Sequence, residues 1–213
     1  MLWSLCASVL CLGVCMPLFM YYKKSLNPVL SCSFKALGTA CALMLVLVSA
    51  IRLDQRCWIL VAGMSFHLAA DILLEFSFPI GIALFMAGHL GYIAFLTQLY
   101  PISVAHLVCF ILLLFFLFML LRQWKKQGEK KASLFAVYGI ILCAMGACAI
   151  AGGVSSYSLP GYLMAAAGGF FLFSDTFWAR RLLFRTPRYV DWLIISTYYI
   201  AQLLFGTACI LLT

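Results

Sequence analysis

Apolar residues fill the chain in long runs, and short polar breaks separate the runs. The pattern predicts eight apolar helices, at residues 2–22, 28–51, 57–76, 79–99, 102–121, 132–151, 158–178 and 190–212. Each run is close to the length of about 20 residues that a helix needs to cross a bilayer. The two longest breaks, residues 122–131 and 179–189, are too short to hold a soluble domain. We therefore expect an all-α fold, a polytopic transmembrane bundle of about eight helices in which residues 1–213 form a single integral membrane domain.

The composition narrows the class of protein further. Of the 213 residues, 66% are hydrophobic and 9% are charged, whereas a soluble domain carries about a quarter charged residues. This excludes a soluble enzyme, a nucleic-acid-binding domain and a disordered tail. The ten cysteines lie mostly inside apolar runs without zinc-like spacing, so we expect them to pack as small apolar side chains and expect neither a metal nor another cofactor.

The basic residues predict an orientation. Connections that follow the first, third, fifth and seventh runs carry eleven of the fourteen Lys and Arg residues, and the opposite side carries only Arg52 and Arg56. The positive-inside rule makes the first set cytoplasmic and places both termini on the non-cytoplasmic side. The net charge of +8 then reflects topology and anionic lipids rather than nucleic acid. We read the first run as a retained span, because it lacks a basic leader. We expect the membrane to be either a bacterial inner membrane or an intracellular membrane such as the endoplasmic reticulum.

Several polar side chains lie inside the apolar runs, where they are costly and usually face a bundle interior or a water-filled cavity. At a rise of about 1.5 Å per residue, five of them fall about 5–15 Å below the predicted cytoplasmic edge. Each of the five comes from a different run: they are Lys35, Asp71, His89, Asp175 and Tyr198. Three further polar side chains lie in the same apolar runs: His67, Glu75 and Gln202. We therefore expect a polar cavity in the cytoplasmic half of the bundle.

Some of these residues have a simpler structural interpretation. Glu75 is close enough to its helix end to be a solvated carboxylate, and His67, one turn deeper than Asp71, is placed to hydrogen-bond to it. Lys35 has the charge to neutralise Asp71 or Asp175. For Asp71, His89 and Asp175 a functional role is favoured over a structural one.

The motifs around these residues resemble those of the YhhN-type lysoplasmalogenase family. Residues 66–74 (FHLAADILL) and 85–92 (FMAGHLGY) are similar to its paired "GD…L" and "AH…Y" segments. Residues 173–175 (FSD) and 196–202 (STYYIAQ) are similar to its "SD" and "TYYxAQ" segments, and Lys35 lies where the family tends to have "KP". The resemblance covers most of the chain, including the layout of eight helices.

Three motif positions depart from the family pattern. Ala70 replaces a glycine, Gly88 an alanine and Ala36 a proline. The ionisable groups are intact, so the departures change local packing beside them.

The resemblance implies hydrolysis of the vinyl ether bond of a lysoplasmalogen to a fatty aldehyde and a glycerophospho-base. A vinyl ether hydrolyses when an acid protonates its alkene carbon and water captures the resulting oxocarbenium ion. As in glycoside hydrolysis, one protonated and one charged carboxyl group meet this demand. Asp71 and Asp175 are expected to divide these roles, in an order that the residues leave open, and His89 is expected to relay a proton or position water.

The same resemblance implies partners and supporting residues. The partners are a lysophospholipid substrate and the surrounding membrane lipids, with no nucleic acid. Tyr198, Tyr199 and Gln202 are candidates to bind the glycerol hydroxyl or the phosphate, and Arg181 lies where an anionic headgroup would enter. Lys35 and His67 complete the set as supporting residues.

Two other functional classes use the same residues. A transporter of small molecules or ions would employ the buried Asp, His and Lys cluster as a proton or ion site, and an inverted repeat and broken helices would distinguish it. A non-catalytic lipid-binding protein would hold an acyl chain without turnover.

Overall fold

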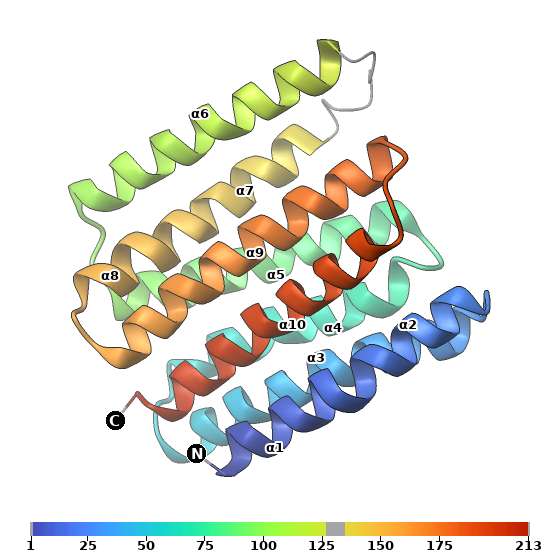
Figure 1. The fold of residues 1–213 in the computed structure, drawn as a ribbon. Coiled ribbons are helices and arrows are strands. Elements are labelled where there is room, and N and C mark those ends of the chain that lie inside the picture. Colours follow the sequence, from blue (N-terminus) through green and yellow to red (C-terminus); the bar gives the residue numbers. More distant parts are fainter. Residues whose placement is uncertain (1, 127–134, 213) are drawn as a thin grey trace.

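The computed structural model describes residues 2–126 and 135–212, and this part of the chain is helical with no strand. Eight helical rods follow one another (Figure 1). They are Leu2–Lys24 (α1 Leu2–Leu10, η1 Cys11–Cys15 and α2 Met16–Lys24), α3 Pro28–Arg52, α4 Cys57–Leu73, α5 Phe78–Leu99, α6 Val104–Lys126, Phe135–Ser155 (α7 Phe135–Ala147, η3 Cys148–Gly152 and α8 Gly153–Ser155), α9 Leu159–Leu183 and α10 Tyr189–Ile210. The predicted all-α bundle is confirmed.

Six of the rods are long and apolar enough to cross a membrane, as judged by length and composition. The other two are α4, which has 17 residues, and α9, which contains three charged side chains. The chain is therefore a multi-pass membrane protein. The start of the run predicted at 132 and two bases of the charge count, Lys130 and Lys131, lie outside the described residues.

Local sequence signals fix where the helices begin. Proline occupies the first turn of α3, α5 and α9, where its missing N–H costs no hydrogen bond. The side chain of Asn27 caps α3 by accepting from the Leu30 N–H at 3.1 Å, and Ser158 caps α9 by accepting from the Gly161 N–H at 3.2 Å. These caps place each new helix directly after a short connection.

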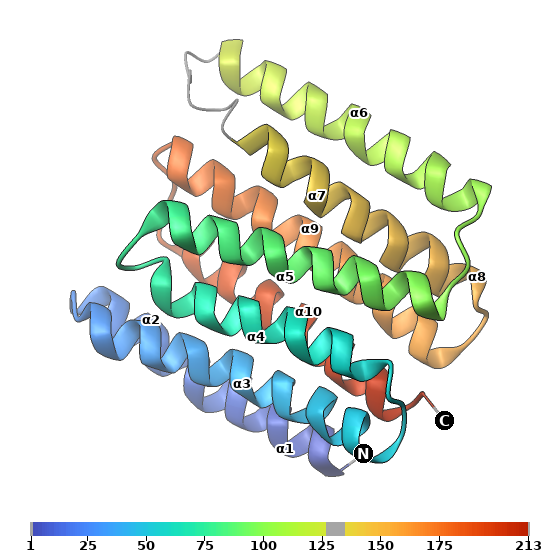
Figure 2. The same ribbon diagram turned by 180° about the vertical axis from the view of Figure 1, so that it is seen from behind.

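Six helices form a closed ring in which each contacts the next: α3, α4, α5, α7, α9 and α10, which returns to α3. The first rod, Leu2–Lys24, packs on α3 and α10, and α6 packs on α7 at the opposite edge of the bundle (Figures 1 and 2). The outward side of α6 is exposed and apolar, as expected for a surface that faces lipid chains.

Both chain ends lie at one end of the bundle (Figure 1). The last turns of α2, α6 and α9, which carry basic residues, lie at the other end (Figure 1). This arrangement agrees with the division of basic residues in the sequence. Which end faces the cytoplasm stays a prediction.

Three glycines bring α4 and α5 into backbone contact. A Cβ on Gly63 would lie 3.1 Å from the Gly88 carbonyl oxygen, and a Cβ on Gly91 would lie 2.7 Å from the Gly63 Cα. Small residues allow membrane helices to approach this closely. The crossing sets the rings of His67 and His89 edge to face, with centroids 4.7 Å apart.

Candidate active site

Each helix of the ring contributes a polar side chain to a shared interior. In chain order these are Lys35, Asp71, His89, Tyr138, Asp175 and Tyr198. The layer predicted from helix depth therefore exists, and a sixth helix contributes to it. The six side chains form two adjoining clusters, one around each carboxyl group.

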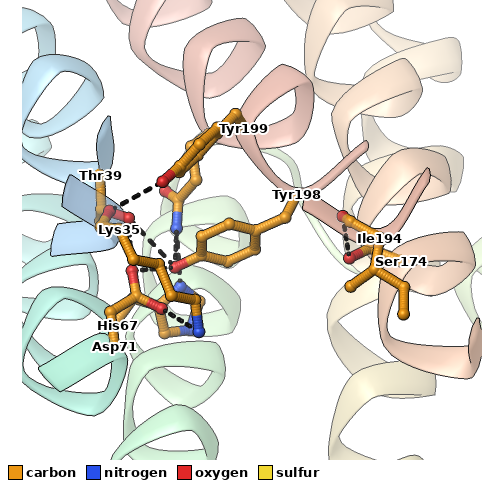
Figure 3. Close-up of polar contacts among 9 residues, drawn as sticks. Lys35, Thr39, His67, Asp71, Ser174, Ile194, Tyr198 and Tyr199 are labelled. Atoms are coloured by element: carbon orange, nitrogen blue, oxygen red, sulfur yellow. Dashed lines mark hydrogen bonds and ion pairs between the residues drawn. The ribbon is translucent and has the colours of Figure 1, made fainter. Parts of the chain in front are cut away.

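The first cluster surrounds Asp71, which is fully buried. The Lys35 ammonium lies 3.0 Å from its Oδ1, and the hydroxyls of Thr39 and Tyr198 donate to its Oδ2 at 2.5 and 3.0 Å (Figure 3). Lys35 also lies over the ring of Phe85, 5.6 Å from its centroid. Three donors thus hold one carboxyl group in a fixed orientation.

Gln202 extends this cluster into the bundle. Its amide nitrogen donates to the Tyr198 hydroxyl at 3.2 Å and contacts Nδ1 of His67 at 3.1 Å, while its oxygen accepts from the Tyr92 hydroxyl at 2.6 Å. The expected bond between His67 and Asp71 is wrong: in the described part of the chain, His67 bonds instead to Gln202, because it lies on the α5 side of its own helix.

The second cluster surrounds Asp175. The Tyr138 hydroxyl donates to its Oδ2, and His89 Nε2 lies 3.3 Å from the same oxygen and 3.2 Å from the Tyr138 oxygen. His89 is fully buried, whereas the Asp175 side chain is 11% exposed. The hydrogen bonds of the described residues use only Oδ2 of this carboxyl group, and Asp175 lines an adjacent cavity.

That cavity narrows from the basic end of the bundle toward Asp175. The outer part, of about 410 Å³, is lined by Lys23, Glu75, Arg181, Asp191 and apolar side chains; the inner recess, of about 40 Å³, reaches Asp175. Five residues line both parts: Lys35, Leu74, Trp178, Ile194 and Ile195. A water molecule needs about 10–15 Å³ of such space, so the recess has room for more than one.

The predicted site residues occupy different depths. Asp175, Lys35 and Tyr198 line the recess, and Arg181 lines the outer cavity, where it is paired with Asp191 at 3.2 Å. Glu75 is exposed at the mouth, as expected of a solvated carboxylate.

Five other predicted residues lie behind the wall, outside both sets of lining residues: Asp71, His67, His89, Tyr199 and Gln202. The Tyr199 hydroxyl donates to the Lys35 carbonyl oxygen at 3.0 Å. In this structure Tyr199 and Gln202 therefore hold neighbouring protein groups.

Two residues of the clusters were not singled out from the sequence. Thr39 follows Lys35 by four residues and so shares its helix face. Tyr138 lies near the basic end of a run that is otherwise apolar. Applying the depth argument to hydroxyl groups as well as ionisable groups would have found both. No three His, Cys, Asp or Glu side chains gather as metal ligands in the described residues.

The fold and the buried clusters define an integral membrane protein with a candidate active site inside a ring of helices. The model of the YhhN family matches residues 30–209, which include nearly all of the six ring helices, and the chain belongs to this family. No curated protein and no solved structure matches the chain.

Proposed function

We propose that this protein is a membrane-embedded hydrolase that cleaves the vinyl ether bond of lysoplasmalogens to a fatty aldehyde and a glycerophospho-base. Membership of the YhhN family, whose type is lysoplasmalogenase, supports a membrane hydrolase. One observation carries the proposal: Asp175 lies on the wall of a narrow cavity and shares one carboxyl oxygen with His89 and Tyr138.

Asp175 is the proposed acid and base. Its protonated carboxyl donates to the alkene carbon remote from the ether oxygen, which leaves an oxocarbenium ion beside the new carboxylate. Water in the recess attacks the carbon that bears oxygen and gives its proton to Asp175, so that a hemiacetal forms. Transfer of the hemiacetal hydroxyl proton to the glycerol oxygen, through Asp175, breaks the carbon–oxygen bond and releases aldehyde and alcohol.

His89 and Tyr138 orient this acid. Both contact Oδ2 of Asp175, which leaves Oδ1 to face the substrate. The preorganised carboxylate then stabilises the oxocarbenium charge without reorganisation, which is how fixed polar groups lower a barrier most effectively.

Asp71 acts through Lys35 in this proposal. An unpaired ammonium group at the recess would repel a developing cation, and the ion pair of 3.0 Å between Lys35 and Asp71 neutralises it. Asp71 is therefore a positioning residue, and Asp175 is the catalytic one. The cavity opens at the basic end of the bundle, which the basic residues predict to be cytoplasmic, so the proposed route of substrate entry is from the cytoplasmic leaflet.

Aldehyde release from a lysoplasmalogen by the purified protein in detergent tests the proposal. We expect Asp175→Asn to abolish release and Asp54→Asn to retain it, because Asp54 pairs with Arg56 outside the ring and outside both parts of the cavity. Absence of aldehyde from the unmodified protein would refute the reaction. Full activity of a folded Asp175→Asn variant would refute the role of Asp175.

The transporter interpretation depends on helices broken within the membrane. Each of the eight rods in residues 2–126 and 135–212 is continuous, although two contain a π-helical segment, η1 and η3. This backbone supports the hydrolase over the transporter.

A further inference from the structure

Three charged side chains form an ion-pair bridge at the mouth of the cavity. Asp191, in the first turn of α10, lies 3.2 Å from Lys23 Nζ at the end of the first rod. Nε of Arg181 on α9 lies 3.2 Å from the same oxygen, Oδ1, and the second carboxyl oxygen accepts from the Arg181 guanidinium at 3.3 Å. The bridge thus ties three helices together at one carboxylate.

The bridge forms part of the wall between two cavities. On one side is the outer cavity of about 410 Å³ that leads to Asp175, and on the other is a groove of about 520 Å³. Lys23, Arg181 and Asp191 line both. The groove is also lined by residues typical of a membrane–water interface: Tyr21, Lys24, Arg188 and Trp192. Opening the bridge would join this groove to the cavity.

The charges of the bridge are unequal. Two cations share one carboxylate, so the group carries a formal charge of +1, which matches a phosphodiester anion. A guanidinium binds carboxylate and phosphate through the same forked geometry. The first turn of α10, a helix of 22 residues, adds the positive end of the helix dipole, which favours an anion. Asp191 therefore occupies a place that suits a phosphate.

We propose that Lys23 and Arg181 bind the phosphodiester of a lysophospholipid headgroup that enters through the groove and displaces Asp191. The substrate class rests on the proposed function. The spacing along α9 agrees with binding of one lipid at both Arg181 and Asp175. Arg181 follows Asp175 by six residues, about 9 Å along the helix axis. The glycerol unit that joins the phosphate to the vinyl ether is of comparable length. One lipid therefore reaches both sites.

Equilibrium binding to the full chain tests the site without using the reaction. The probe is a lysophospholipid with an ethanolamine headgroup and a saturated ether chain, which cannot be hydrolysed by protonation of an alkene. Its matched partner is an alkylglycerol of the same chain length without phosphate. For Lys23→Gln and Arg181→Gln we expect the Kd of the phospholipid to rise on the order of tenfold and that of the alkylglycerol to stay unchanged.

Two further variants control the interpretation. Arg185→Gln removes the same charge from the same end of the bundle outside both cavities, and we expect no change in either Kd. Asp191→Asn frees the two cations, and we expect tighter binding of the phospholipid, a gain that misfolding does not produce.

The outcomes separate the two proposals. Equal effects on both ligands, or no effect on either, would overturn the headgroup site. Inorganic phosphate that displaces the phospholipid at equal concentration would assign the site to free phosphate instead. If lipid binding depends on the phosphate but the unmodified protein releases no aldehyde, the proposed reaction is refuted and the proposed headgroup site is supported.

Discussion

Replacing Gly88 by Ala tests the contact that positions the two histidines. A Cβ built on Gly88 would lie 2.0 Å from Cδ2 and 2.4 Å from Nε2 of His67, and 3.0 Å from the Gly63 carbonyl oxygen. The two distances to His67 are far inside van der Waals contact, and the distance to the Gly63 oxygen is at its limit. The helix or the imidazole ring must therefore move.

The His67 ring has no free space into which to move. It is fully buried and stacks on Tyr92 at 5.1 Å, with Phe85 at 5.2 Å and Phe171 at 5.6 Å on other sides. Overpacking a core costs about 1–3 kcal/mol, and the better helix propensity of Ala returns up to about 1 kcal/mol. We expect a net loss of about 2 kcal/mol, which lowers Tm by about 4–8 °C in a chain of this size.

Thermal unfolding in one detergent, followed by tryptophan fluorescence, measures this effect. The matched control is Gly169→Ala on α9, where a Cβ would meet nothing within 4 Å. We expect Gly169→Ala to keep or raise Tm, because only the propensity gain remains. A Tm for Gly88→Ala equal to that of the unmodified protein would show that this packing does not hold the His67 ring.

Three other changes probe the clusters and the surface. Tyr138→Phe removes a hydroxyl from the proposed acid and should lower kcat for aldehyde release on the order of tenfold with little change in Tm; an unchanged kcat contradicts that role. Lys35→Met leaves the buried Asp71 carboxylate without its counter-ion and should lower the free energy of unfolding by about 3–5 kcal/mol. Adding Asp71→Leu should restore most of that stability, and Tm measurements of the single and double variants check this. The hydrogen bonds of the Arg56 side chain hold the pKa of Asp54 below its usual value. This ion pair, in the connection between α3 and α4, therefore stabilises the fold above about pH 4 and loses its effect as pH falls through the lowered pKa. At pH 7, Asp54→Asn should therefore cost less than about 1 kcal/mol of stability and lower Tm by less than about 2–4 °C. It should also narrow the Tm difference between pH 7 and pH 3.

The helices were predictable because the bilayer fixes their length. A helix needs about 20 apolar residues to span a bilayer. Prolines such as Pro28 and Pro160 lie in the first turns of their helices. The helix predicted to end at residue 76 instead ends at Leu73, because residues 74–76 form a turn before α5 begins at Phe78. Sequence position alone does not separate the last helical turn from such a turn.

The level of each side chain along the helix axes was predictable, and its direction around the axis was not. A constant rise per residue places Lys35, Asp175 and Tyr198 at one level whatever the packing. Which side chains reach the cavity depends on the order of helices around the ring, and no local pattern encodes that order. Tyr199 and Gln202 are neighbours of Tyr198 in the chain, yet their hydroxyl and amide groups bond to the protein interior.

The charges along the cavity are complementary to the charges that the lipid carries in the proposed reaction. At the mouth, the ion-pair bridge carries a formal charge of +1, where the phosphate would bind. At the middle, Lys35 and Asp71 cancel each other. At the recess, Asp175 becomes an anion at the step in which the substrate becomes a cation. The lipid in its transition state is negative at one end and positive at the other, so this order of charges stabilises it more than the ground state, which lacks the positive end.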